Sequence, residues 1–270
     1  MLRLSSFSDA MAAVARGRDV AVRAYTLGDA LLRAIESRAQ SGAHVTVTLE
    51  ADPSGSDSDG LCRRNADVTA RLRSYGIDAR LERNVHTKTV TVDETVFFDG
   101  SNWRRGDVVL SGSEGDAARV ASLKSAALAD EAAMLEDARC KREPGIVVET
   151  ETFDRFNVVS KALREMAEQG LSPRLLVDER ALRDSSREAA SLEKVAAEGV
   201  DVRVCDDTEK FALAGSRAWL GSANASAVWR GHDMTDWGVV TEDPAIVGAV
   251  RDRVEERWAH ARELRALLVV

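Results

Sequence analysis

Two spacings of apolar residues alternate along the first half of the chain. Apolar residues at every second position predict strands, whereas apolar residues three or four positions apart, as at Leu31, Leu32 and Ile35, predict helices. In chain order the pattern predicts a strand over residues 19–25, a helix over 30–40, a strand over 43–50, a helix ending at Leu72, a strand over 76–82 and a hairpin within 86–103.

The second half of the chain repeats this order from Gly145 onward. The predicted elements are a strand over 145–151, a helix over 156–170, a strand over 173–179, a helix over 186–199, a strand over 199–207 and a long helix from Pro244. A repeat over half the chain length predicts two similar lobes, which we place at residues 1–143 and 144–270. Because strands and helices alternate in each lobe, we expect an α/β fold with mostly parallel or mixed sheets and helices outside them.

Length, charge and cysteine content restrict the class of protein. The 270 residues, 44% of them hydrophobic, suffice for a packed core, and no apolar run approaches the roughly 20 residues that a membrane helix needs. Polar residues interrupt the N-terminal segment, so we expect a cytoplasmic protein without an integral membrane segment. The net charge of -8 disfavours non-specific binding of nucleic acid, and three scattered Cys encode neither a disulfide framework nor a zinc site.

The repeat also has a register in its lysine and asparagine residues. The chain has 6 Lys among 37 basic residues, and the same offset separates Lys88 from Lys210 and Asn102 from Asn224. A compact ammonium group is therefore expected to be needed at both Lys positions. The same offset from His86 leads to position 208, where the chain has Thr instead of a second His.

The segment 86–103 resembles the HxK, Asp, GSxN signature of the phospholipase D superfamily. The residues that carry this resemblance are His86, Lys88, Asp93, Gly100, Ser101 and Asn102. Asn102 follows Ser101 directly, one position earlier than in the signature. The second lobe retains Lys210, Gly221, Ser222 and Asn224 but lacks the His and the Asp.

This resemblance implies a phosphodiesterase of two lobes, related by pseudo-twofold symmetry, whose two motifs meet in one site. In the superfamily one His attacks phosphorus to form a phosphohistidine, the other His protonates the leaving oxygen, and water or an alcohol resolves the intermediate. The resemblance makes His86 the nucleophile and implies neither a metal nor a cofactor. It also implies phosphate-binding roles for Lys88, Lys210, Asn102 and Asn224, supported by Ser101 and Ser222.

The chemistry of the residues agrees with this interpretation. Residues two apart on a strand share a face, so His86 and Lys88 are expected side by side. A neutral imidazole is a competent nucleophile near pH 7, and an ammonium group can hold phosphoryl oxygens as charge develops. Asp93, at the predicted hairpin, is expected to act as a structural hydrogen-bond acceptor. The resemblance further implies a carboxylate that orients the attacking His, for which Asp107 and Asp236 are the candidates.

Thr208 removes the expected proton donor, a role that contributes about 10² to 10⁴ in rate. Three interpretations follow. A homodimer could bring two first lobes together; a substitute acid could complete the site, with His232 as the candidate and Asp207 and Glu209 beside Thr208; or the chain could be a catalytically reduced module that binds phosphate or nucleic acid. The partner stays open between a nucleic-acid phosphodiester and a phospholipid head group.

Overall fold

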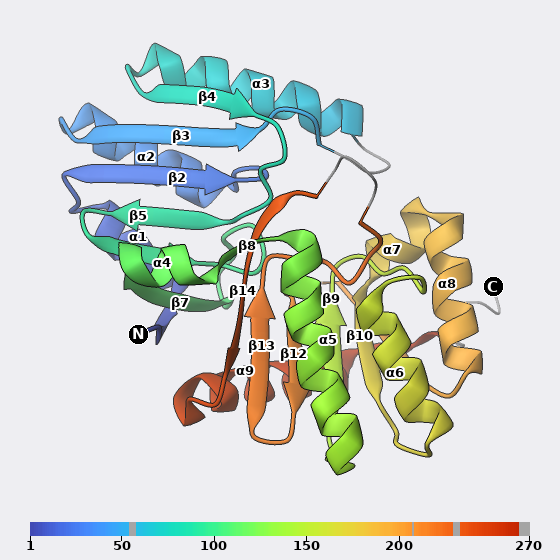
Figure 1. Cartoon of the computed structure of the whole chain (residues 1–270). Coiled ribbons are helices and arrows are strands. Elements are labelled where there is room, and N and C mark those ends of the chain that lie inside the picture. Colours follow the sequence, from blue (N-terminus) through green and yellow to red (C-terminus); the bar gives the residue numbers. More distant parts are fainter. Residues whose placement is uncertain (54–57, 207, 229–232, 265–270) are drawn as a thin grey trace. The chain divides into compact units, whose positions relative to one another are not determined.

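The chain folds into two compact units (Figure 1). A computed structural model describes residues 1–53, 58–206, 208–228 and 233–264. The first unit comprises Met1–Ala121 and Met234–Trp237, and the second comprises Ser122–Asp233 and Gly238–Val270. The predicted boundary between residues 143 and 144 comes after α5 (Lys124–Lys141), which groups with the second unit, and this boundary stays a prediction.

The first unit is built on a seven-stranded mixed sheet with the order β1-β7-β6-β5-β2-β3-β4. Strands β2, β3 and β4 are parallel, whereas β5, β6, β7 and β1 continue the sheet as antiparallel neighbours. The strands are β1 (Arg3–Ser6), β2 (Asp19–Ala24), β3 (His44–Glu50), β4 (Asp78–Glu82), β5 (Thr89–Val92), β6 (Thr95–Phe98) and β7 (Val108–Ser113). The helices are α1 (Phe7–Val14), α2 (Asp29–Gln40), α3 (Ser58–Ser74) and α4 (Glu114–Val120).

Apolar periodicity accounts for the core of the first unit. On β2, Val20 and Val22 are buried while the intervening residue is exposed, so one face of this strand turns to the core. On α2, Leu31 and Ile35 lie one helical turn apart and are both buried in the same cluster as the β2 residues. The expected helix over 30–40 is therefore confirmed, with one additional residue at its start.

The second unit is built on an eight-stranded mixed sheet with the order β15-β11-β10-β9-β12-β13-β14-β8. The strands of this sheet are β8 (Ala121–Leu123), β9 (Val147–Thr150), β10 (Arg174–Asp178), β11 (Asp201–Cys205), β12 (Phe211–Ala214), β13 (Arg217–Gly221), β14 (Thr235–Thr241) and β15 (Arg262–Glu263). The first residues of β8 and β14 are grouped with the first unit. Besides α5, its helices are α6 (Val158–Glu168), α7 (Glu179–Asp184), α8 (Ser186–Ala197) and α9 (Pro244–His260). A separate hydrophobic cluster forms the core of this unit.

The internal repeat predicted from the sequence is present in the sheet topology. Strands β7-β6-β5-β2-β3-β4 of the first sheet and β14-β13-β12-β9-β10-β11 of the second follow the same order, with three parallel strands beside three antiparallel ones in each. The expected α/β class with two lobes of mixed sheets is therefore confirmed. None of the helices in the described ranges combines the length and the apolar composition that a membrane crossing requires.

Candidate active site

His86 is held by a short segment that comes from far along the chain. Its backbone N–H donates to the carbonyl oxygen of Thr235 over 3.0 Å, and Val85 forms an isolated parallel bridge with the same residue. This pairing places Asp236 beside the imidazole, with 2.7 Å between His86 Nδ1 and Asp236 Oδ1. Both residues are buried, and both belong to the first unit. A carboxylate on Nδ1 favours the tautomer in which Nε2 carries the free electron pair.

Lys88 lies against both ring nitrogens of His86. Its Nζ is 3.3 Å from His86 Nε2 and 3.4 Å from Nδ1, and it donates to the His86 carbonyl oxygen over 2.8 Å. The side chain is 1% exposed, so burial limits the competition of bulk water for its ammonium group. The structure thus brings together His86, Lys88 and Asp236, three of the residues that the sequence analysis selected.

Tyr25 is a member of this group that the sequence analysis missed. Its ring meets the imidazole of His86 edge to face, with 5.1 Å between the centroids, and Lys88 Nζ lies 6.0 Å from the ring centroid. Asn65 on α3 anchors this position by donating from Nδ2 to the Tyr25 carbonyl oxygen. Tyr25 directly follows β2, and residues after the carboxyl ends of parallel strands often line active sites in α/β folds. That position was a usable signal in the sequence.

Asp93 occupies the tight turn between β5 and β6, where its φ of 52° is in the left-handed region. Its Oδ1 accepts hydrogen bonds from the backbone N–H groups of Arg18 and Asp19, both over 3.0 Å. These two hydrogen bonds lower the pKa of the Asp93 carboxyl. The carboxylate therefore fastens the turn to the start of β2.

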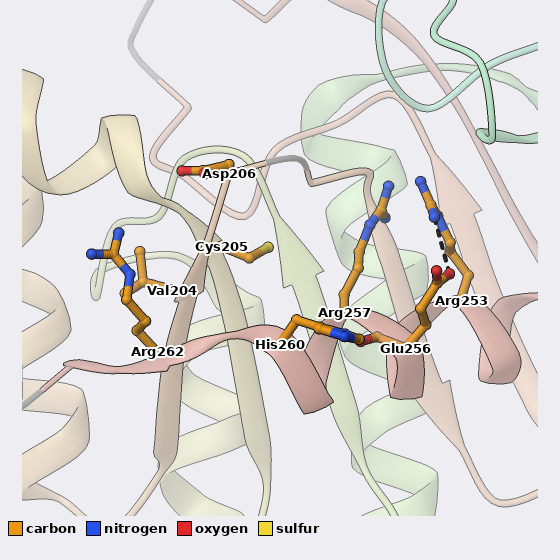
Figure 2. A pocket seen from close by; sticks show the side chains of 8 residues that line it. All are labelled: Val204, Cys205, Asp206, Arg253, Glu256, Arg257, His260 and Arg262. Atoms are coloured by element: carbon orange, nitrogen blue, oxygen red, sulfur yellow. Dashed lines mark hydrogen bonds and ion pairs between the residues drawn. The ribbon is translucent and has the colours of Figure 1, made fainter.

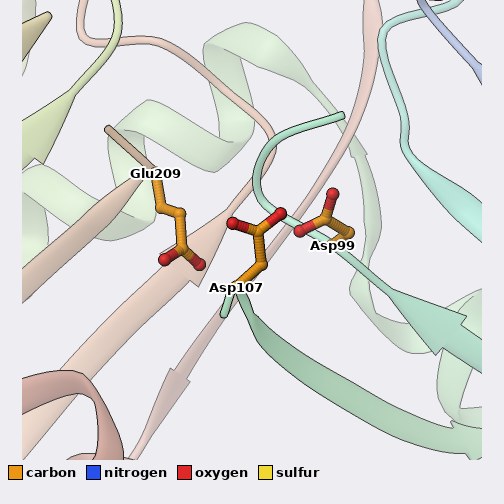
Figure 3. Close-up of side chains that lie close together, drawn as sticks. All are labelled: Asp99, Asp107 and Glu209. Atoms are coloured by element: carbon orange, nitrogen blue, oxygen red, sulfur yellow. The ribbon is translucent and has the colours of Figure 1, made fainter. Parts of the chain in front are cut away.

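A loop over residues 99–107 joins β6 to β7, and a buried carboxyl group stands at each end of it (Figure 3). Asp99 Oδ2 accepts from the backbone N–H of Trp103 over 2.5 Å. Asp107 Oδ2 accepts from Ser101 Oγ over 2.5 Å and from the backbone N–H of Arg104 over 2.7 Å. Burial, with the neighbouring Asp107 charge as the second cause, raises the pKa of Asp99 to about 7.

The two candidates for the carboxylate that orients the imidazole, Asp107 and Asp236, have different surroundings. Asp236 contacts His86, whereas Asp107 accepts hydrogen bonds from Ser101 and Arg104 within its own loop. Asn102 in the same loop has a buried side-chain oxygen without a hydrogen-bond partner among the described residues. A Cβ at Gly28, the N-cap of α2, would lie 3.0 Å from the Asn102 carbonyl oxygen, so a side chain at this position would press on the loop.

In the second unit, the position that corresponds to Lys88 is already part of an ion pair. Lys210 is fully buried, and its Nζ lies 3.1 Å from Glu151 Oε2. Thr208 is also buried and offers no imidazole. Asn224 Oδ1 accepts from the backbone N–H of Thr152 over 3.4 Å.

Three further candidates, Ser222, His232 and Asp207, come from the second half of the chain. Ser222 is fully buried at the end of β13. His232, the candidate for a substitute acid, and its alternative Asp207 lie outside the described residues.

A pocket of about 330 Å³ lies between the end of β11 and the end of α9 in the second unit (Figure 2). Its lining residues are Val204, Cys205, Asp206, Arg253, Glu256, Arg257, His260 and Arg262. The three guanidinium groups all have carboxylate partners, since Arg253 pairs with Glu256, Arg257 with Glu209 and Arg262 with Glu179. The pocket is therefore charge-balanced and offers no surplus positive charge to an anion.

The comparisons with known proteins identify the fold. No protein-family model and no curated protein matches the sequence. Among solved structures, a phosphatidylserine synthase from Haemophilus influenzae Rd KW20 matches with a TM-score of 0.66 and 11% identity, over 97% of this chain and 87% of that chain. A polyphosphate kinase from Porphyromonas gingivalis matches with a TM-score of 0.58 and 14% identity, over 94% of this chain.

The class that these findings define is the phospholipase D-like fold, which both solved structures share and which this chain has. The predicted resemblance is thus confirmed at the level of the fold. The chain spans 46% of the length of the polyphosphate kinase and most of the phosphatidylserine synthase.

Proposed function

We propose that this protein is a phosphodiester hydrolase or phosphotransferase that uses His86 as its nucleophile. The observation that carries the proposal is the contact of His86 Nδ1 with Asp236, with Lys88 Nζ beside the same imidazole. A buried carboxylate and an ammonium group around one imidazole are suited to nucleophilic attack on a phosphate. The fold also supports phosphoryl-transfer chemistry, because the two solved structures that share it are a phosphatidylserine synthase and a polyphosphate kinase.

In the proposed reaction, the free electron pair of His86 Nε2 attacks phosphorus and the bond from phosphorus to the leaving oxygen breaks. Asp236 stabilises the positive charge that develops on the imidazole, as a buried carboxylate does for a catalytic His elsewhere. Lys88 holds the phosphoryl oxygens. Water or an alcohol then attacks the phosphohistidine, which releases a phosphate monoester or a new phosphodiester and restores His86.

Two substrate classes fit the proposal, a nucleic-acid phosphodiester and a phospholipid head group. The acidic composition, with a net charge of -8, gives little support for non-specific binding of either an anionic membrane or a nucleic acid. Incubating the protein in parallel with single-stranded DNA and with vesicles of phosphatidylcholine and phosphatidylglycerol distinguishes the two classes.

A second candidate function is a catalytically reduced module that binds phosphate without turnover. The observations that favour it are Thr208 in place of an imidazole and the pairing of Lys210 with Glu151. Both features reduce the chemistry that the second unit could supply. The homodimer interpretation is tested separately by the mass of the protein in sedimentation equilibrium.

The deciding experiment measures release of p-nitrophenol from bis(p-nitrophenyl) phosphate in EDTA. Wild type is compared with His86→Ala and with His44→Ala, a matched control because His44 is an exposed surface residue whose neighbour is Asp19. We expect turnover and an acid-labile phosphoryl adduct in wild type and in His44→Ala, and neither in His86→Ala. Folded wild-type protein that neither turns over nor forms the adduct would favour the binding module.

A further inference from the structure

The proposed reaction needs a proton for the leaving oxygen, and position 208 has no group that titrates near pH 7. The first unit contains buried carboxyl groups that the proposed nucleophile does not use. Asp99 is fully buried and Asp107 is 5% exposed, and oxygen atoms of the two side chains lie within 4.8 Å of each other (Figure 3). Two buried carboxyl groups this close favour holding one proton between them over ionising together.

Ser101 connects the two carboxyl groups. Its Oγ lies 2.5 Å from Asp107 Oδ2 and 3.4 Å from Asp99 Oδ2. The Oδ1 atoms of both Asp residues are buried and have no hydrogen-bond partner within the described ranges. The hydrogen bonds from the backbone N–H groups of Trp103 and Arg104 to the two Oδ2 atoms would be enough to hold the loop. The additional buried oxygens are costly unless the pair carries a proton or another cation.

The position of the pair links it to the proposed site. The backbone N–H of Asp99 donates to the Lys88 carbonyl oxygen over 3.0 Å, so Asp99 stands directly across the β5–β6 ladder from the phosphate-binding Lys. Ser101 follows two residues later in the loop that the sequence signature associates with phosphate. The pKa of Asp99, raised to about 7 mainly by burial, means that much of this carboxyl is protonated at neutral pH.

We propose that Asp99, Ser101 and Asp107 form a proton relay that protonates the leaving oxygen in place of the missing imidazole. This inference rests on the proposed function. When the bond from phosphorus to the leaving oxygen breaks, the Ser101 hydroxyl gives its proton to that oxygen and receives the proton of Asp99. The carboxyl pair is left fully ionised, and it recovers a proton through Ser101 from the water or alcohol that attacks the phosphohistidine.

The relay is tested by the dependence of the rate on the leaving group. A p-nitrophenolate leaves with little help from an acid, whereas the alkoxide of a dinucleoside phosphate or of a dialkyl phosphate needs a proton. We expect Asp99→Asn, Asp107→Asn and Ser101→Ala to lower kcat on the alkyl substrate by about 10² to 10⁴ more than they lower kcat on the p-nitrophenyl substrate. Ser101→Ala removes a single oxygen atom, so it retains the test if an Asp variant does not fold.

Asp116→Asn is the matched control, because Asp116 is also a buried carboxylate of the first unit but lies in the first turn of α4, where it completes a capping box with Ser113. It is expected to lower stability without changing the ratio of the two rates. Equal losses of kcat on both substrates in the relay variants would show that these residues only hold the loop in place, and would overturn the proposal. A requirement for added Mg²⁺ would overturn it in favour of a cation between the carboxylates. Failure of the proposed function is distinct, because the p-nitrophenyl substrate would then show no turnover that depends on His86.

Discussion

At the scale of single residues, the site depends on what each nitrogen of His86 contacts. Asp236 contacts Nδ1 and Lys88 lies near both ring nitrogens, while the ring of Tyr25 meets the imidazole edge to face. The three neighbours differ in chemistry, so substitutions at each test a different property of His86. Lys88 tests the nearby positive charge, Asp236 tests the tautomer, and Tyr25 tests the packing of the imidazole.

Asp236→Asn tests the tautomer. An amide can donate to Nδ1 and thereby favour the tautomer that has its proton on Nε2, which cannot attack phosphorus. We expect kcat on the p-nitrophenyl substrate to fall by about 10² to 10⁴ with a small change in KM. Unchanged kcat in a folded variant would show that the carboxylate does not act on His86.

Tyr25 is expected to position the imidazole through its ring and not through its hydroxyl group. Tyr25→Phe retains the edge contact and should keep nearly full activity, whereas Tyr25→Ala frees the imidazole and should lower kcat by up to about 10². The measurement is kcat and KM for both variants beside wild type. Equal losses in Phe and Ala variants would instead assign the effect to the hydroxyl group.

At the scale of elements, α5 contains a buried carboxyl group that its sequence does not explain. The helix extends over Lys124–Lys141, and Glu131 in its middle is 1% exposed. Burial raises the pKa of Glu131 well above its ordinary value of 4.5. Protonation of this carboxyl group therefore favours the folded state.

The pH dependence of stability tests this consequence. Below pH 4.5 the Glu131 carboxyl is neutral in both the folded and the unfolded protein. As the pH rises from 4.5 to the pKa of Glu131 in the folded protein, the free energy of unfolding falls, because only the unfolded chain ionises freely. Glu131→Gln removes this loss. We expect urea unfolding to show the variant more stable than wild type at pH 8, with a smaller difference at pH 5. A difference that does not depend on pH would contradict the assignment.

At the scale of the whole molecule, the two units share a topology but differ in their motif residues. In the first unit Lys88 contacts the imidazole of His86. In the second unit Lys210 pairs with Glu151, and Thr208 stands at the position that corresponds to His86. The repeat is thus conserved in backbone order and divergent in side-chain chemistry. Catalysis is expected to depend unequally on the two halves.

Substituting each Lys by Met measures this inequality. Lys88→Met is expected to abolish release of p-nitrophenol, because it removes the charge beside Nε2. Lys210→Met should change kcat much less and should lower the free energy of unfolding, since it removes a fully buried ammonium group from Glu151, which keeps its ion pair with Arg180. Equal kinetic losses in both variants would show that the second unit contributes as much to phosphate binding as the first.

The sequence was sufficient for features that repeat locally. Apolar periodicity predicted α2 and the parallel strands, and the repeated order of elements predicted two similar lobes, whose sheets share one strand order in the structure. The HxK spacing predicted His86 and Lys88 on one side of the chain, because residues two apart on an extended segment share a face. These predictions succeed because each depends on residues near one another in the chain or on comparison of the two halves.

Only the tertiary structure decided which distant side chains meet. Asp107 and Asp236 were equal candidates in the sequence, yet the pairing of Thr235 with His86 brings Asp236 to the imidazole, while Asp107 bonds to Ser101. The pairing of Glu151 with Lys210 had no signal in the motif either. The spacing of residues along a strand or helix determines which face a side chain occupies, but the packing of segments far apart in the chain determines what that face contacts.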